Sequence, residues 1–290
     1  MGGRLVIVGV AAALIGCSGP SHPTTADRAN PNRPRATATS RGGQPPGGRQ
    51  PAASPRPAGR RLIAARAHIP VLTYHQVRDW RPSDSPAARQ LITPPAVFAA
   101  QMDALAHAGY ATISGTRLVD HLLTGAPLPP KPLLVTFDDA SQGQYTNALP
   151  ILRRHRFVAT FFVMTVVLDK PHWLSRAQVR RLDRLGMTIA AHSWDHQPVP
   201  TYHGPDWRIQ LVRPAGELGR LVGHPVRLFA YPYGRCTRTA FPKLRQAGYV
   251  AAFQLAGPMD PTGPQWTIRR IMVAPTWSMA TLLGRIAHSF

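Results

Sequence analysis

Residues 133–139 read LLVTFDD and predict a buried strand that ends in two adjacent carboxylates. A short run of apolar and β-branched residues is typical of such a strand. Asp138 and Asp139 form the only adjacent acidic pair among the 13 Asp and Glu residues of the chain. Because neighbouring carboxylates repel each other, this pair indicates a bound cation or a shared proton.

About fifty residues further on, His192 and His196 stand four positions apart in the segment HSWDH. One carboxylate and two imidazoles are a common ligand set for catalytic zinc, with a fourth position left open for water. Histidines at this spacing lie on one face of a helical turn, although an isolated pair is also compatible with ordinary core or surface positions. The acid pair upstream favours the metal site and leaves one carboxylate free to act as a base.

Expected strands and helices alternate along residues 70–290, which indicates an α/β fold with parallel strands and crossover helices, in a sheet or a barrel. Sites in such folds lie at the carboxyl ends of the strands, where His75, Asp138, Asp139, His192 and the turn 231–234 are expected. The predicted strands are 69–74, 110–113, 133–137, 158–164, 187–191, 226–230, 249–253 and 267–273. The predicted helices are 94–108, 118–123, 142–155, 176–185, 206–221, 240–247 and a last one after Ser278, with Pro150 and Pro214 inside two of them.

The first 69 residues predict an export signal and a tether. Residues 1–16 contain Arg4 and an apolar run too short to span a bilayer, which is typical of a signal peptide. They lead into Cys17 in a sequence that resembles a bacterial lipoprotein processing site, and this resemblance implies cleavage before Cys17 and a lipid on its sulfur; an ordinary secretory signal is the alternative. Residues 17–69 are rich in Pro and Arg and predict a disordered tether. The mature protein is therefore expected on the outer face of the cytoplasmic membrane or in the envelope.

The formal net charge of +21 raises the question of a nucleic-acid partner. An export signal and the absence of a recognisable nucleic-acid motif argue against one. The arginines of the tether are instead expected to favour anionic lipid or acidic wall polymers.

Three motifs, in order and at strand ends, resemble the polysaccharide deacetylases (NodB-homology domain, carbohydrate esterase family 4). They are TFDD at 136–139, HSWDH at 192–196 and PYG at 232–234. The segments PVLTYH, LPPKPLLVTFDD and FAYPYG further resemble the branch of exported poly-β-1,6-N-acetylglucosamine deacetylases. The resemblance covers residues 70–290 and implies a distorted (β/α) barrel of about seven strands that binds one divalent metal ion, usually zinc.

The resemblance also implies residue roles. Asp139, His192 and His196 would ligate the metal, and Asp138 would be the general base for the attacking water; a helix N-cap is the alternative for Asp138. The backbone N–H of Tyr233 would bind the oxyanion, although residues 232–234 also fit a simple tight turn.

Two positions depart from the family pattern. Ala230 stands where many members carry an arginine that tethers the base, so Arg269 or Arg270 on the last strand is a candidate for that role, with a solvated strand arginine as the alternative. Ala140 stands where the family usually has glycine. The general acid stays open, with His75 a candidate that is equally compatible with a hydrogen-bonded core histidine.

Together with the resemblance, the sequence predicts an envelope-tethered hydrolase that depends on one divalent metal, with zinc favoured, and removes N-acetyl groups from a polysaccharide, with poly-β-1,6-N-acetylglucosamine favoured as substrate. Peptidoglycan or a chitin oligomer is the alternative substrate. A non-catalytic glycan-binding lipoprotein is the alternative of another class.

Overall fold

The computed structural model describes residues 58–290, so the predicted signal peptide, Cys17 and most of the predicted tether lie outside the described residues. The main sheet has seven parallel strands in the order β10-β1-β5-β6-β7-β8-β9, and β4 pairs with the start of β5 beside them. The bounds of the seven are β1 Val71–Tyr74, β5 Pro132–Phe137, β6 Ala159–Val163, β7 Thr188–Ala191, β8 Leu228–Ala230, β9 Ala251–Phe253 and β10 Ile271–Met272, and β4 is Ala111–Thr112. A small second sheet pairs β2 Gln76–Val77 with β3 Ile92–Thr93.

Residues 268–273 nearly close the sheet into a barrel. Ile268 forms a parallel bridge with Phe253 at the end of β9, and β10 pairs with β1 through Leu72 and Ile271. One short segment therefore contacts both edges of the sheet. The predicted distorted (β/α) barrel of about seven strands is confirmed, and the last strand is shorter than the predicted 267–273 because the chain crosses there from one edge to the other.

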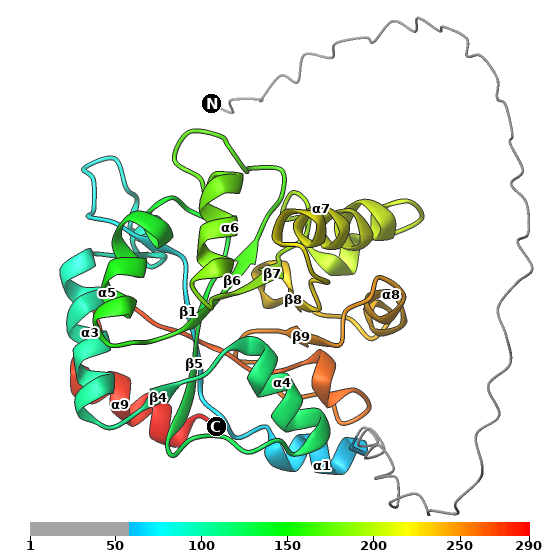
Figure 1. Cartoon of the computed structure of the whole chain (residues 1–290), viewed down its shortest axis with the longest axis horizontal. Coiled ribbons are helices and arrows are strands. Elements are labelled where there is room, and N and C mark those ends of the chain that lie inside the picture. The colour runs from blue at the N-terminus through cyan, green and yellow to red at the C-terminus, as the bar shows by residue number, and fades with distance from the viewer. Residues whose placement is uncertain (1–57) are drawn as a thin grey trace, which may run out of the picture. The chain divides into compact units, whose positions relative to one another are not determined.

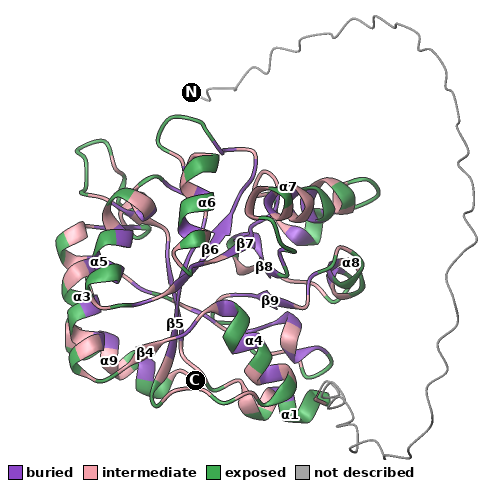
Figure 2. Cartoon of the chain, viewed as in Figure 1, coloured by how far each residue is buried: buried purple, intermediate pink, exposed green. Residues whose placement is uncertain are grey.

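Helices cover both faces of the curved sheet (Figure 1). One face packs on α3, α5, α6, α7, α8 and α9, and the other packs on α1 and α4. Strands β1, β5, β6, β7, β8 and β9 are almost entirely buried and β4 and β10 only partly so, whereas the helices keep exposed outer sides (Figure 2). The helix bounds are α1 Arg60–Arg66, α2 Pro86–Arg89, α3 Pro95–His107, α4 Gly115–Thr124, α5 Leu149–Arg154, α6 Arg176–Arg184, α7 Arg213–Val222, α8 Ala240–Gln246 and α9 Met279–His288.

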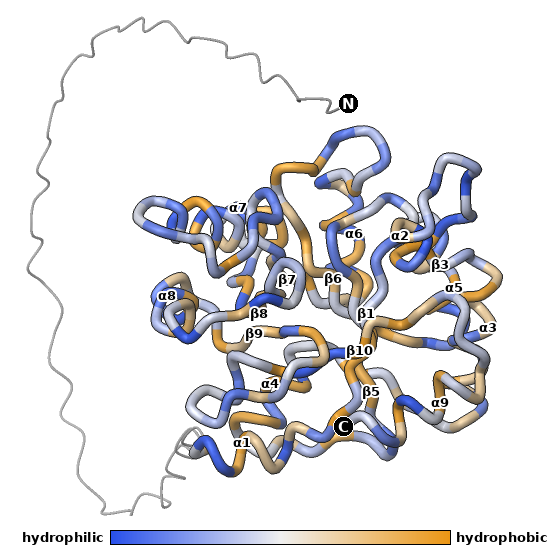
Figure 3. Tube along the Cα trace, turned by 180° about the vertical axis from the view of Figure 1, so that it is seen from behind, coloured by the Kyte–Doolittle hydropathy of each residue, from blue (hydrophilic) through white to orange (hydrophobic). Residues whose placement is uncertain are grey.

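Strand β5 shows why both faces of the sheet form a core. Its side chains alternate, with Leu133, Val135 and Phe137 in one cluster and Leu134 in the other. Hydrophobic residues concentrate along β5 and β1 at the centre of the domain (Figure 3). A strand buried on both sides reads as a continuous apolar run, which is the pattern of LLVTF.

The folded domain begins earlier than the predicted boundary at residue 70. Helix α1 lies inside the predicted tether, and its Ile63 is buried against the α4 face of the sheet. Arg66 donates hydrogen bonds to the carbonyl oxygens of His121 and Leu122 at the end of α4. The prediction of disorder up to residue 69 is therefore wrong for residues 58–69, because Ile63 and Arg66 contact residues that lie more than fifty positions further along the chain.

The helices begin close to the predicted positions. Helix α3 begins after Pro94, and Thr93 belongs to β3. Helix α8 follows Thr239 without a side-chain cap. The side chains of Ser175 and Ser278 cap α6 and α9 by accepting hydrogen bonds from the N–H groups of Gln178 and Thr281. Within residues 58–290, no helix combines the length and hydrophobicity needed to cross a bilayer.

Candidate active site

The two carboxylates after β5 point in different directions. Asp138 continues the strand, since its N–H donates to the carbonyl of Tyr74 on β1, and its side chain is buried. Asp139 has a left-handed backbone with φ 76°, which turns its side chain away from that of Asp138. The next residue, Ala140, is also left-handed at φ 71°, which explains why glycine would suit this position. The sharp turn directs the two carboxylates apart, although the charge of Asp138 still acts to raise the pKa of Asp139.

His192 follows β7 and is oriented by the neighbouring strand. Its Nδ1 lies 2.8 Å from the carbonyl oxygen of Ala230 at the end of β8. A carbonyl accepts only, so Nδ1 carries the proton and donates, and the lone pair of a neutral ring lies on Nε2. Ala230, at the position where many family members carry an arginine, therefore contributes its backbone carbonyl to orient the candidate ligand His192.

His196 reaches the same place through a loop. The expected helical turn for residues 192–196 is wrong, because Ser193 and His196 have left-handed backbones with φ 64° and 70°. The Ser193 hydroxyl accepts a hydrogen bond from the His196 N–H at 2.9 Å and stabilises the turn. The two imidazoles meet nevertheless, with Nε2 atoms 3.2 Å apart.

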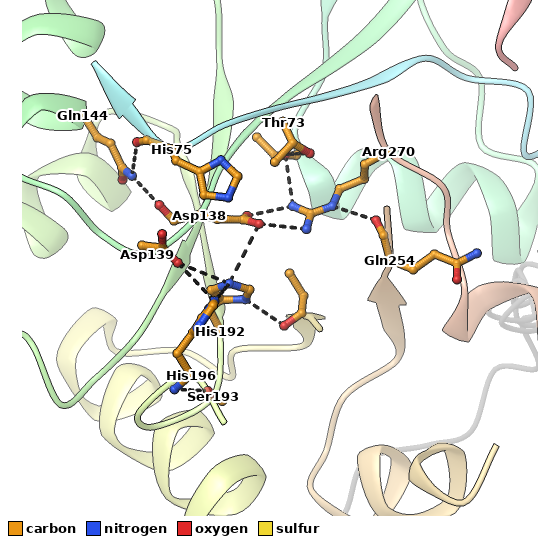
Figure 4. A network of polar contacts seen from close by, with 12 residues as sticks. Thr73, His75, Asp138, Asp139, Gln144, His192, Ser193, His196, Gln254 and Arg270 are labelled. Atoms are coloured by element: carbon orange, nitrogen blue, oxygen red, sulfur yellow. Dashed lines mark hydrogen bonds and ion pairs between the residues drawn. The ribbon is translucent and has the colours of Figure 1, made fainter. Parts of the chain in front are cut away.

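Three donor atoms form an almost equilateral triangle (Figure 4). Oδ1 of Asp139 lies 3.4 Å from Nε2 of His192 and 3.4 Å from Nε2 of His196, and the two Nε2 atoms are 3.2 Å apart. In a tetrahedral zinc site with bonds of about 2.0–2.1 Å, ligand atoms are separated by about 3.3 Å. Oδ1 of Asp139 is buried and has no hydrogen-bond partner among the described residues. The three side chains therefore fit one small divalent ion.

Arg270 holds Asp138 from the other side of the barrel. Its Nη1 and Nη2 donate to Oδ1 and Oδ2 of Asp138 at 2.7 and 2.8 Å, and its Nε donates to the carbonyl of Gln254 at 3.0 Å. Arg270 is 1% exposed, so the alternative of a solvated strand arginine is wrong for this residue. Both carboxylate oxygens of Asp138 bind Arg270, which also excludes the helix-cap alternative. Arg269 instead lies over the ring of Phe290.

Burial and charge act against each other on the pKa values of Asp138, Asp139 and His192, but not on that of His196. Burial alone would raise the pKa of Asp138, but Arg270 and His192 more than offset it and hold that pKa well below its usual range. Burial would likewise raise the pKa of Asp139, but the hydrogen bond and charge of His192 lower it. Burial would lower the pKa of His192, but the two carboxylates raise it. Burial and the neighbouring His192 lower the pKa of His196 to about 4.

Tyr233 stands at the rim of the site in an unfavourable backbone conformation. It has φ 59° and ψ 12°, a region that non-glycine residues seldom adopt, and its side chain is 59% exposed. Its ring packs edge-on against His196 with centroids 4.4 Å apart. Among the described residues, its N–H has no hydrogen-bond partner. Strained residues of this kind concentrate at functional sites, which supports a role for this turn beyond chain reversal.

His75 also belongs to the site. Its imidazole points toward the Asp138 carboxylate (Figure 4), and its charge would lower the pKa of both acids. Its carbonyl accepts hydrogen bonds from Ser141 and Gln144, so its backbone is fixed. The structure thus brings His75, Tyr233 and Arg270 together with the two aspartates and the two histidines, whereas Arg269 lies outside the site.

Two buried glutamines were missed by the sequence analysis. Gln144 donates to the carbonyls of Asp138 and His75 at 2.5 and 2.8 Å. Gln210 accepts from the N–H groups of Trp194 and Asp195 and donates to the Asp195 carboxylate at 2.7 Å. Each glutamine fixes one of the two loops that carry the candidate metal ligands.

Both glutamines lie on π-helical turns, Gln144–Ala148 and Arg208–Val212, which begin six residues before Pro150 and Pro214. The N–H groups of Leu149 and Arg213 reach back five residues to the carbonyls of Gln144 and Arg208. Proline cannot occupy the interior of a regular α-helix, and the wider turns accommodate it. The expected helices 142–155 and 206–221 are therefore each a π-turn followed by α5 or α7. The internal proline was the only signal in the sequence for these turns.

The model of the family described as polysaccharide deacetylase matches residues 125–252, which include both ligand-bearing loops and the turn at Tyr233. Among proteins of named function, the poly-β-1,6-N-acetyl-D-glucosamine N-deacetylase of Escherichia coli K12 is 24% identical over 221 residues. That alignment covers 61% of this chain but only 33% of the relative, so this chain spans about a third of its length.

Solved structures share the fold. The Streptococcus pyogenes deacetylase PplD, solved in complex with acetate, aligns with a TM-score of 0.70 at 23% identity and covers 75% of this chain and 97% of its own. IcaB from Ammonifex degensii aligns with a TM-score of 0.64 at 26% identity, over 75% of this chain and 96% of its own. The agreement extends over the whole barrel. Residues 125–252 therefore carry a polysaccharide deacetylase domain, the domain of a hydrolase that acts on carbon–nitrogen bonds.

Proposed function

We propose that the domain is a metal-dependent N-deacetylase of an N-acetylglucosamine polymer, which releases acetate and leaves a free amine. The observation that carries this proposal is the triangle of Asp139, His192 and His196 beside the Asp138 carboxylate, whose Oδ2 lies 3.9 Å from Nε2 of His192. A site that only binds glycan needs no carboxylate beside the metal ligands, whereas hydrolysis of an amide needs one as the base.

A divalent ion in this triangle would polarise the acetamide carbonyl and lower the pKa of water. The chain supplies the remaining steps. Asp138 accepts the proton of the attacking water, while its low pKa keeps it ionised at neutral pH. The Tyr233 N–H donates to the oxygen that becomes negative in the tetrahedral intermediate. Collapse of that intermediate breaks the C–N bond, and the leaving nitrogen takes a proton from protonated Asp138 or from His75.

Arg270 sets the basicity of Asp138. A carboxylate paired with a buried guanidinium is a weak base, so it holds the water through a hydrogen bond and returns the proton readily. Arg270 thereby tethers the base, a role for which Ala230 has no suitable side chain. It reaches Asp138 from the last strand because residues 268–273 lie between β9 and β1.

For the polymer, poly-β-1,6-N-acetylglucosamine is the favoured substrate. The E. coli relative, named for this activity, and the segments PVLTYH and FAYPYG support it. Acetate release by the zinc-loaded full chain from β-1,6-linked N-acetylglucosamine oligomers, peptidoglycan and chitin oligomers tests the proposal, each with and without chelator. Release of acetate from peptidoglycan alone would make peptidoglycan the substrate instead of poly-β-1,6-N-acetylglucosamine. No release from any glycan by metal-loaded protein would favour the non-catalytic glycan-binding protein.

We also propose that the chain is exported and anchored by a lipid on Cys17, on the strength of the sequence of residues 1–17. Growth with an alkyne analogue of palmitate should label the protein in cells, and Cys17→Ala should remove the label. Labelling that survives this substitution would contradict the anchor.

A further inference from the structure

The domain carries a large excess of positive charge that the active site does not use. Residues 58–290 contain 27 Lys and Arg against 12 Asp and Glu. In a fold of parallel strands, every strand ends at the catalytic end, and every loop from a helix into the next strand lies at the opposite end. We call that opposite end the basal face and define it by its exposed basic residues, which are Lys131, Arg153, Arg154, Arg156, Arg184, Arg227 and Arg245.

Part of the positive charge at the catalytic end is paired with acids, although Arg81, Lys170 and Arg208 form no ion pair within residues 58–290. At the catalytic end Arg78 pairs with Asp84 at 2.8 Å, Arg176 with Asp169, and Arg238 with Asp260 at 2.6 Å. No residue of the basal face forms an ion pair with an acid within residues 58–290.

The helices that lead to the basal face carry four acids. Asp183 pairs with His224 at 2.8 Å, Asp103 with His155 at 2.7 Å and Glu217 with Arg213 at 2.8 Å, whereas Asp120 on α4 forms no ion pair within residues 58–290. None of these acids is therefore paired with a basal arginine or with Lys131.

Helix dipoles explain only part of this pattern. Basic residues in the last helical turn stabilise a helix, and this accounts for Arg153 and Arg154 on α5, Arg184 on α6 and Arg245 on α8. Lys131, Arg156 and Arg227 lie outside helices and gain nothing from a dipole. Helices α5, α6 and α8 also lack an acid in the first turn, where a dipole would favour one. The positive charge thus belongs to the face rather than to individual helices.

We propose that the basal face docks on the surface of a bilayer that contains anionic phospholipid, with the catalytic end turned away from the membrane. The basic residues come from the loops or helix ends before β5, β6, β7, β8 and β9. A lipid surface can contact side chains spread over a whole end of a domain at once, whereas one extended polymer chain follows a line. Each basic residue near an anionic surface strengthens binding by about fivefold at physiological salt. Docking of this kind goes beyond the proposed chemistry and does not depend on it.

Two charge-matched variants of the full chain test the proposal, both made with Cys17→Ala so that no lipid is attached. The basal variant combines Arg153→Gln, Arg154→Gln and Arg156→Gln. The control removes three exposed charges near the catalytic end, through Arg81→Gln, Lys170→Gln and Arg208→Gln. Binding to vesicles of phosphatidylcholine with 30% phosphatidylglycerol is expected to fall about 100-fold in the basal variant and less than fivefold in the control. Residues 1–57 are common to both variants, so their contribution cancels.

Three outcomes would overturn the proposal. One is an equal loss in both variants, which would show that net charge alone matters. Another is no preference for anionic over pure phosphatidylcholine vesicles. The third is weak vesicle binding together with tight binding of soluble polyphosphate that the basal variant abolishes, which would make an anionic polymer the partner. Acetate release from a soluble oligosaccharide is measured in parallel, and the basal variant should match the parent protein, so a failure of the chemistry and a failure of docking are told apart.

Discussion

Arg270 donates two hydrogen bonds to Asp138 across 132 positions of sequence, and both side chains are almost completely buried. A buried ion pair of this geometry adds little net stability over an apolar pair, but breaking it leaves a buried charge without a partner. The ion pair in the centre of the barrel is therefore best explained by its effect on the pKa of Asp138, the carboxylate next to the metal ligands.

Arg270→Met is expected to destabilise the fold by about 3–5 kcal/mol, because Asp138 loses its only cationic hydrogen-bond donor. In the surviving folded protein the pKa of Asp138 should rise, so the acidic limb of the pH–rate profile moves to higher pH. Arg269→Met, next to it and only partly buried, is the control and should change stability by less than about 1 kcal/mol. Chemical denaturation and the pH profile of acetate release check both. Equal losses in the two variants would contradict the assignment.

Asp138→Asn is expected to retain zinc and lower turnover by about 10²–10⁴-fold, since the amide cannot accept the proton of the attacking water. Zinc content by atomic absorption and acetate release are the two measurements. Turnover within a few-fold of the parent protein would remove Asp138 from the base role.

His192→Ala is expected to abolish stoichiometric zinc binding, because one of three ligands is lost and the cavity keeps an unpaired aspartate. His203→Ala removes an exposed histidine outside the triangle and should leave the zinc content unchanged. Full zinc retention in His192→Ala would show that the ion sits elsewhere.

Zinc binding to the metal-free protein should release protons near neutral pH. The pKa of His192 is raised by Asp138 and Asp139, so below that pKa its Nε2 carries a proton that the ion must displace. Zinc affinity therefore rises with pH up to the raised pKa and levels off above it. His196, with a pKa near 4, adds almost nothing. Calorimetry in buffers of different ionisation enthalpy measures the proton count, and Asp138→Asn should reduce it. A proton count of zero at pH 6 would contradict this order of pKa values.

Gln210→Leu should weaken zinc binding about 10–100-fold, because the N–H groups of Trp194 and Asp195 lose their common acceptor in the loop between the two histidines. Gln210→Glu combined with Asp195→Asn keeps an acceptor for the two N–H groups and a donor between the two side chains, so this double variant should recover most of the affinity. Competition with a chromophoric chelator gives the affinities, and circular dichroism shows whether the fold is intact. Equal affinity in both variants would reduce Gln210 to a packing role.

The sequence determined the strands, their parallel arrangement and the four residues at the centre of the site. Strand β5 could be predicted because it is buried on both faces and therefore apolar throughout, and the acids and histidines could be found because they follow strands that end at one edge. The helix pattern was equally visible for α6, whose cap and apolar spacing are local features.

Only the tertiary structure decided which residues complete those four. The sequence left Arg269 and Arg270 as candidates to hold Asp138, and only the position of residues 268–273 between β9 and β1 turns the Arg270 side chain into the barrel. The Ala230 carbonyl that orients His192 is a backbone group, which residue type does not reveal. Gln210 lies on a π-turn for which the internal Pro214 was the only signal in the sequence. Local sequence encodes burial and periodicity, whereas the partner of a buried charge is fixed by contacts between segments more than a hundred residues apart.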